Sequence, residues 1–177
     1  MTMTTPPDHT EASEYYFTYI DQVAPGEICS ILEVQSAETL ALVATISEER
    51  SLTRYAADKW TIRELVGHLN DTERLFHFRA WWFARGFDTP LPSFDQHVAV
   101  AAAGANERSL ASLAEEFGVV RAASLSFFGN LPAEAWSRRG VASGNPFTVR
   151  ALAYLAAGHV THHLKVLRDR YLSAPPQ

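Results

Sequence analysis

Cysteine is almost absent from this chain: Cys29 is the single one among 177 residues. One cysteine cannot close an intrachain disulfide, so the fold has to be held by a packed core, which a chain of this length can build. The lack of disulfides suits a reducing compartment, and we expect a cytoplasmic protein. Because Cys29 lies in a segment with apolar helical periodicity, we expect a small buried side chain there rather than a nucleophile.

Positive charge is also scarce, with 15 Lys and Arg against 20 Asp and Glu and a net charge of -5. Proteins that bind nucleic acid through its backbone neutralise the phosphates with clustered Lys and Arg. The basic runs here are short, and the one at residues 165–170 suits a helix end that complements the helix dipole. We therefore expect no nucleic-acid partner.

Long apolar runs and targeting signals are missing too. No stretch reaches the roughly 20 apolar residues that span a bilayer, so no membrane partner is expected. The opening MTMTTPPDHTEASE lacks the basic and apolar regions of a signal peptide. We expect residues 1–14 to be a disordered lead-in, residues 15–172 to form one domain, and residues 173–177 to be a tail.

What the chain does contain is helical periodicity, in four segments separated by Pro and Gly. Thr61 followed by Glu64 predicts a capping box at the start of one helix, and Thr148 predicts the cap of another. The four expected helices cover about residues 26–46, 61–85, 106–129 and 148–172. The fold class predicted is all-α, a four-helix bundle.

The segments between these helices are expected to be irregular. YYFTYI, before the first helix, is aromatic and β-branched and predicts a short extended piece packed on the bundle. Between the second and third helices, FDTPLPSFDQHVAV predicts a long loop, and loops of this length are often functional. PAEAW predicts a short helix, and SRRGVASGNPF a polar connection without convincing strand alternation.

Histidines are concentrated where the bundle interior is expected. In GHVTHHLKVL, His159 and His163 are four residues apart and point almost the same way on a helix, into its apolar rows. His68 shares the core-facing side of its helix with Leu65 and Leu69. A lone buried histidine is more often a satisfied core residue than a ligand. Three unpaired imidazoles in one apolar seam would be costly to bury, and a divalent cation that takes their lone pairs removes that cost.

The other histidines are weaker candidates. His162 lies about 100° from its neighbour on the helix and is expected at the flank, either beside the ligands or exposed. His77 is expected on the opposite face from His68, at the surface or in a dimer contact. His97, in the long loop, could approach the site, and His9 falls in the lead-in.

Acidic residues near the histidines are candidates for supporting roles. Asp71 lies about one turn after His68, where it could hold that ligand's outer nitrogen or accept a proton as a catalytic residue. A polar residue at the helix edge is an equal alternative. Glu73 points elsewhere and is expected to be solvated, and the role of Asp95 in the loop is open.

Four segments in combination resemble the DinB/YfiT-like superfamily of metal-binding proteins, over about residues 15–172: KWTIRELVGHLNDTERLFHFRAWWFARG, TPLPSFDQ, NERSLASLAEEF and AGHVTHHLKVLRDRYL. The resemblance implies a four-helix bundle with a three-histidine metal site at one end, in which His68, His159 and His163 are the ligands and water completes the coordination. Zinc and nickel both suit imidazole. The family pattern has an acid after the FDQ element, where this chain has His97.

The resemblance also implies a class of chemistry. Relatives are described as enzymes in which a low-molecular-weight thiol attacks an electrophile, or as metal-dependent hydrolases. We therefore expect a metal-dependent transferase that uses such a thiol on a small electrophile, or a related hydrolase. A non-catalytic, stress-associated metal-binding bundle is the alternative, and a structural bundle without metal is a third. Trp81, Trp82 and Phe83 are consecutive, so one should point outward, which suggests a homodimer. Coverage of that residue by the long Pro-rich loop is the alternative.

Overall fold

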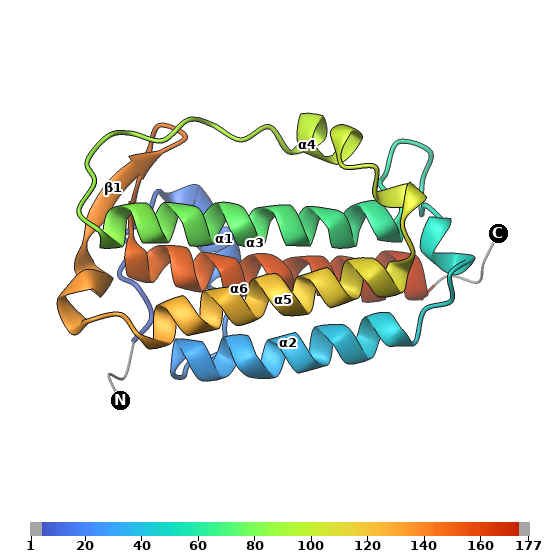
Figure 1. The fold of residues 1–177 in the computed structure, drawn as a ribbon, viewed down its shortest axis with the longest axis horizontal. Coiled ribbons are helices and arrows are strands. Elements are labelled where there is room, and N and C mark those ends of the chain that lie inside the picture. The colour runs from blue at the N-terminus through green and yellow to red at the C-terminus, as the bar shows by residue number, and fades with distance from the viewer. Residues whose placement is uncertain (1–4, 174–177) are drawn as a thin grey trace.

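The computed structural model describes residues 5–173, and the expectations for residues 1–4 and 174–177 lie outside this range. Four long helices run side by side (Figure 1): α2 (Ile28–Ala44), α3 (Ile62–Ala84), α5 (Leu110–Gly129) and α6 (Val149–Val166). The third, α3, packs on both α5 and α6, and α2 packs on α5. The predicted all-α four-helix bundle is confirmed.

Two short helices and several single turns complete the helical structure. The helix α1 (Glu14–Ile20) packs on α6, and α4 (Gln96–Ala102) packs on α3. The single turns are the 3-10 helices η1 (Arg50–Leu52), η2 (Ala105–Glu107) and η3 (Ala133–Ser137), and a π-helical end to α6, η4 (Leu167–Leu172). Two apolar clusters form the core along the bundle. Among the described residues, no helix combines the length and hydropathy needed to cross a bilayer.

The caps explain where the long helices begin. Thr61 and Glu64 form the predicted capping box at α3, and Thr148 accepts a hydrogen bond from the Ala151 amide at α6. The start of α5 differs from the expectation near residue 106. Ser109 is the N-cap of α5, because its hydroxyl accepts from the Ser112 amide, and residues 105–107 form a separate 3-10 turn.

The expectation of no strands is wrong for residues 139–148. Strands β1 (Arg139–Ala142) and β2 (Asn145–Thr148) form an antiparallel hairpin in which Ala142 pairs with Asn145. The two-residue turn, Ser143-Gly144, has φ values of 52° and 72°. Such a turn with two left-handed residues matches the twist of a hairpin, and a glycine at the second position favours it. The strands are only four residues long, so their alternation is too brief to detect in the sequence.

The segment YYFTYI is helical, not extended, because it is part of α1. One contact with α6 depends on Gly158, where a Cβ atom would lie 2.2 Å from the Tyr19 carbonyl oxygen. The α1 backbone therefore approaches α6 at a position that only glycine leaves free. This tertiary contact outweighs the strand propensity of the aromatic and β-branched residues.

Residues 8–13 of the expected lead-in also pack on the fold. Glu11 is buried, forms an ion pair with Arg150 and accepts a hydrogen bond of 2.7 Å from the Thr148 hydroxyl. Ala12 is buried and bridges to Phe147 of the hairpin. These residues are thus part of the domain rather than a disordered lead-in.

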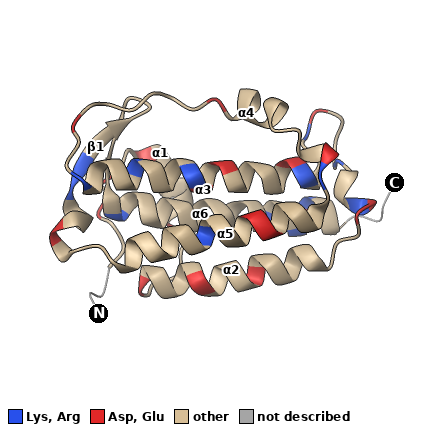
Figure 2. Cartoon of the chain, in the orientation of Figure 1, with Lys and Arg blue, Asp and Glu red and all other residues tan. Residues whose placement is uncertain are grey.

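Glu73 is another correction, since it is buried instead of solvated. Its Oε2 lies 3.0 Å from Nη2 of Arg121, which is itself fully buried on α5. The partner comes from a different helix, so the periodicity of α3 alone could not reveal it. Figure 2 shows charged residues of both signs along α3 and α5, whereas those along α2 are acidic.

Cys29 is half-buried, as expected for a small packed side chain. Burial raises the pKa of its thiol to about 11, and the nearby Glu27 carboxylate acts in the same direction. A thiol that stays protonated is a poor nucleophile. The structure therefore agrees with a packing role for this residue.

Candidate metal centre

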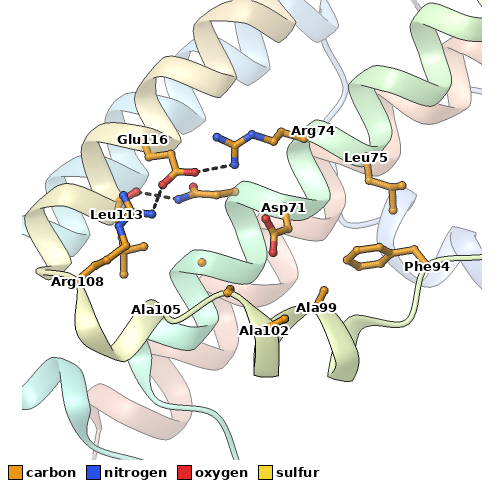
Figure 3. Close-up of a pocket in the computed structure, with 13 residues that line it drawn as sticks. Asp71, Arg74, Leu75, Phe94, Ala99, Ala102, Ala105, Arg108, Leu113 and Glu116 are labelled. Carbon is orange, nitrogen blue, oxygen red and sulfur yellow. Dashed lines mark hydrogen bonds and ion pairs between the residues drawn. The ribbon is translucent and has the colours of Figure 1, made fainter.

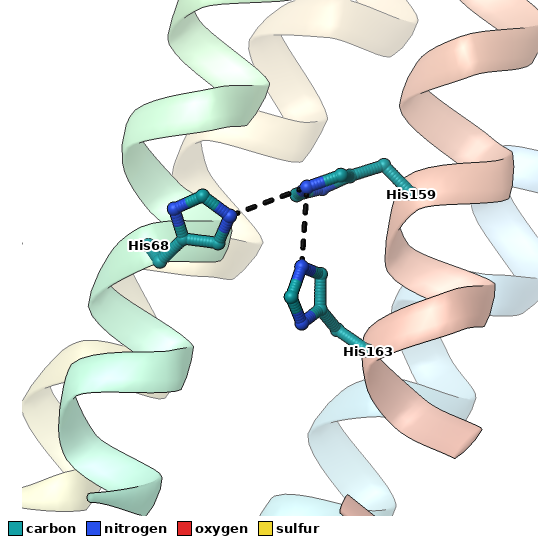
Figure 4. A group of neighbouring side chains, drawn as sticks. All are labelled: His68, His159 and His163. Carbon is teal, nitrogen blue, oxygen red and sulfur yellow. Dashed lines mark hydrogen bonds between the residues drawn. The ribbon is translucent and has the colours of Figure 1, made fainter. Parts of the chain in front are cut away.

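Three imidazoles from two helices meet inside the bundle (Figure 4). His68 projects from the second turn of α3, and His159 and His163 project from successive turns of α6. Their Nε2 atoms face one another, and Nε2 of His159 lies 3.2 Å from Nε2 of each of the other two. One ligand atom from each residue lies within 4.8 Å of the others, a group that could hold a metal ion.

Two of the three separations between these nitrogens are those expected around a single ion. A zinc–nitrogen bond of about 2.05 Å and a tetrahedral angle place two ligand nitrogens about 3.3 Å apart. The two observed separations of 3.2 Å are close to that value. The donors are also of one kind, neutral imidazoles, which suit zinc and other late transition metals.

Thr72 sets the protonation of the central histidine, and the sequence reasoning missed this role. Its hydroxyl donates to the His68 carbonyl oxygen at 2.7 Å, so toward His159 it can only accept. Nδ1 of His159 lies 3.4 Å from Oγ1 of Thr72. This arrangement favours the tautomer of His159 that carries its proton on Nδ1 and directs the lone pair of Nε2 into the cluster. The signal available was the position of Thr72, one turn after His68 on the same face.

In His68 and His163 the outer nitrogen, Nδ1, which faces away from the cluster, has no hydrogen-bond partner comparable to Thr72. Nδ1 of His68 and Nδ1 of His163 are buried without a hydrogen bond to any described residue. A carboxylate often occupies this position in metal sites and makes the imidazole a stronger donor. Without one, a bound cation would keep more of its positive charge.

Burial keeps all three imidazoles neutral at ordinary pH. It lowers the pKa of His68 to about 4 and that of His163 to about 3, and it holds the pKa of His159 well below its usual value. Neighbouring imidazoles add to the lowering for His159 and His163, because a second positive charge so close would be repelled. Neutral imidazoles carry the lone pairs that a cation needs.

Aromatic side chains enclose the cluster. The Trp60 ring lies 4.8 Å from that of His68, and the rings of Tyr19 and Phe76 lie 5.6 and 5.5 Å from that of His159. Tyr19 reaches this position because Gly158 lets α1 approach α6. The rings limit how the imidazoles can turn, which holds the three Nε2 atoms together.

Two open cavities border the cluster. The larger, about 540 Å³, is lined by His68 and His159, and the smaller, about 260 Å³, by His163. Gln96, the first residue of α4, lines both. We call the larger one the His159 cavity and the smaller one the His163 cavity.

The expected long loop contains a helix, α4, whose N-cap is Asp95.

Asp71 is not part of the histidine cluster in this structure. It lines a third cavity of about 550 Å³, which is formed by residues of α3, α4 and α5 (Figure 3), and there it faces Ala99 and Ala102 of α4. It makes no hydrogen bond to His68, whose outer nitrogen is without a partner among the described residues. Burial raises the pKa of Asp71.

The remaining candidates lie around the centre rather than in it. His97 and His162 line the His163 cavity, and the His97 ring lies 5.9 Å from that of Trp60. His77 is half-buried and stacks on Phe127 of α5, with ring centroids 5.0 Å apart, so it is neither at the open surface nor in the cluster. His9 stacks on Phe17, with ring centroids 4.0 Å apart.

Comparison with known proteins places the chain in a family. A model of the DinB superfamily matches residues 31–167, a range that contains all three clustered histidines. The solved structure of YfiT from Bacillus subtilis, described as a probable metal-dependent hydrolase with an unusual four-helix bundle topology, matches with a TM-score of 0.71 at 16% identity, over 92% of this chain and 91% of that one. This likeness shows a shared fold. No curated protein matches the sequence. Since the family model covers well over half of the chain, the protein belongs to the DinB superfamily.

Proposed function

We propose that the protein is a divalent-metal-dependent enzyme acting on a small molecule, with His68, His159 and His163 as the metal ligands. The observation that carries the proposal is the convergence of three neutral imidazoles, in which Nε2 of His159 lies 3.2 Å from Nε2 of each of the other two and two cavities border the group. The description of YfiT as a probable metal-dependent hydrolase supports the same class of chemistry. Zinc and nickel are the proposed ions.

Such an ion would lower the pKa of a water or thiol nucleophile and polarise a carbonyl group of the substrate. The protein's own part is to hold the three donors. Thr72 keeps the His159 proton on the outer nitrogen, and the aromatic rings fix the imidazole planes. Two cavities give two approaches, one for the substrate and one for water or a low-molecular-weight thiol.

The nature of the nucleophile separates two finer hypotheses. In a hydrolase it is water, and in a transferase it is a low-molecular-weight thiol that attacks a small electrophile. The test uses zinc- and nickel-loaded protein with 4-nitrophenyl acetate alone, and with 1-chloro-2,4-dinitrobenzene plus cysteine. Ester cleavage without thiol supports hydrolysis, and conjugation that needs both metal and protein supports thiol transfer.

Controls tie either activity to the centre. His68→Ala should abolish it, because two ligands hold the ion far more weakly than three. His77→Gln, on the same helix but away from the cluster, should retain it. If metal binds at one ion per chain but neither reaction nor a wider set of esters and electrophiles is accelerated, the enzyme proposal fails and a non-catalytic metal-binding bundle is favoured.

Asp71 is proposed as a proton-transfer residue only in the third cavity, since no contact joins it to the ligands. Its raised pKa is the property that such a role needs. A fall of more than about tenfold in rate for Asp71→Asn, within the usual range for general acid–base catalysis, would assign it that role. An unchanged rate would leave it as a polar residue at the helix edge.

A further inference from the structure

Arg79 is a buried cation in the wall of the His159 cavity. The residue is 3% exposed, lies on α3 and shares this cavity with His68 and His159. Its Nη2 atom donates to the Pro92 carbonyl oxygen at 3.1 Å and to the Ser143 hydroxyl at 2.8 Å. Its Nε atom is buried and has no partner among the described residues.

No described carboxylate neutralises this guanidinium. The ion pairs of the described residues do not include Arg79, whereas the other fully buried arginine, Arg121, is paired with Glu73. Asp95 also lines the His159 cavity, but one of its carboxylate oxygens caps α4 by accepting from the amides of His97 and Val98. A buried charge without a counter-ion is costly, so the site favours an anion from outside the chain.

The donors left free suit a planar anion. A guanidinium presents five N–H donors in a fixed fork that matches carboxylate and phosphate oxygens. The two contacts of Arg79 with the protein use Nη2 alone. These two hydrogen bonds hold the guanidinium between Pro92, in the loop after α3, and the turn of the hairpin, where Ser143 has a φ of 52°. A left-handed serine is a strained choice, and here it brings the hydroxyl to Arg79.

The wall of the cavity between the histidines and Arg79 combines polar side chains with apolar ones. Its lining includes these aromatic and aliphatic residues: Tyr15, Tyr16, Tyr19, Leu75, Phe76, Phe94 and Leu155. Eleven residues of α-helix separate His68 from Arg79, which places their Cα atoms about 16 Å apart. Both residues line this cavity, so it extends along α3 from the histidines to Arg79.

We propose that Arg79 binds the anionic group, a carboxylate or a phosphate, of an elongated substrate with an apolar body. The reacting end of that substrate lies at the three histidines. The placement of the reacting end at the histidines rests on the proposed function, whereas the anion site at Arg79 does not. A purely structural role, in which Arg79 only ties the loop to the hairpin, is the competing explanation.

The test measures binding of three probes to the full chain by titration calorimetry: 4-phenylbutyrate, phenyl phosphate and the neutral 4-phenylbutyramide. Each is titrated into ion-free and zinc-loaded protein, with zinc content measured separately. We expect at least one anion to bind at least about tenfold more tightly than the amide, the value of one charge-assisted hydrogen bond. Whichever of the two anions binds more tightly shows whether the site prefers a carboxylate or a phosphate.

Variants connect this preference to Arg79. Arg79→Met should abolish it, Arg79→Lys should retain part of it, and Arg74→Met should leave it unchanged, since Arg74 pairs with Glu116 at a different cavity. Should the Met variant fail to fold, the Lys variant and the comparison of anion with amide in the wild type still decide the matter.

The proposal is overturned if wild-type protein binds neither anion, binds anion and amide equally, or keeps its preference in Arg79→Met. A preference lost in His68→Ala but kept in Arg79→Met would place the anion on the metal and also contradict it. Anion binding in protein that takes up no zinc would refute the proposed function and leave this site standing.

Discussion

A single hydroxyl decides whether the central histidine can act as a ligand. Because Thr72 donates to a backbone carbonyl, it can only accept from Nδ1 of His159, which leaves Nε2 free for an ion. Thr72→Val keeps the shape of the side chain and removes the acceptor. We expect metal affinity to fall by about 10- to 100-fold, as is usual when a partner of a ligand is lost, measured by competition with a chromophoric chelator.

Thr72→Ser provides the matched control for this prediction. It retains the hydroxyl and should bind metal within a few-fold of the wild type. Equal affinities of the Val variant and the wild type would show that the ring of His159 is oriented by packing alone, without help from the Thr72 hydroxyl.

The same buried imidazoles make the ion-free protein sensitive to acid. Below about pH 6.5 the unfolded chain takes up protons on these histidines, whereas the folded chain does not until its pKa values, about 4 for His68 and about 3 for His163, are reached. The unfolded state then binds more protons, so the free energy of unfolding should fall as the pH is lowered from about 6.5 toward 4.

Urea denaturation of ion-free protein at a series of pH values measures this loss. His163→Gln removes one of the titrating groups, so the variant should lose less stability than the wild type over the same pH range. An identical pH dependence in the two proteins would mean that the imidazole is not kept neutral by the fold.

At the scale of the elements, the approach of α1 to α6 encloses the centre. Gly158→Ala would place a methyl group 2.2 Å from the Tyr19 carbonyl oxygen, where backbone on both sides leaves little room to adjust. We expect a loss of about 1–3 kcal/mol in the free energy of unfolding, as for other overpacked sites. Thermal and urea denaturation would measure it.

Gly118 in α5 is the matched helical control. A Cβ atom there would meet Leu40 at 3.6 Å, an ordinary contact. Gly118→Ala should therefore be neutral or stabilising by up to about 1 kcal/mol, because alanine has the higher helix propensity. If the Gly158 variant were as stable as this one, the close packing of α1 on α6 would be refuted.

The elements also show what the sequence could predict. The capping box at Thr61 and the cap at Thr148 are local interactions, so the starts of α3 and α6 were predictable. The four-residue spacing of His159 and His163 fixed their common direction in the same way. The grouping with His68 was inferred, since no local rule links residues 91 positions apart.

What the sequence did not reveal depends on contacts between distant segments. The helix α1 forms where an extended piece was expected, because α6 offers a glycine for it to pack on. Glu73 is buried because Arg121 of another helix neutralises it. The position of Asp71 beside a separate cavity follows from where α4 packs on α3, which no periodicity encodes.

At the scale of the whole molecule, a homodimer remains a prediction. Phe78 and Phe87 are exposed and stack with the half-buried Trp81 and Trp82, which gives one aromatic surface at the end of α3. Trp82 also donates to the Thr89 carbonyl oxygen, so the loop covers part of it. We expect light scattering after size exclusion to give twice the monomer mass for the wild type. The variant Phe78→Glu should have the mass of a monomer. A monomeric wild type would contradict this.

The fold brings α3 and α6, which are far apart in the sequence, together at the three histidines, and two cavities border the cluster. The central claim is that these imidazoles bind one ion in common. Elemental analysis of tag-free protein, reconstituted with zinc or nickel and freed of excess metal, tests it most directly. The account predicts one ion per chain in the wild type and almost none in His68→Ala or His163→Ala. Metal-free wild type, or variants that retain the full ion, would contradict it.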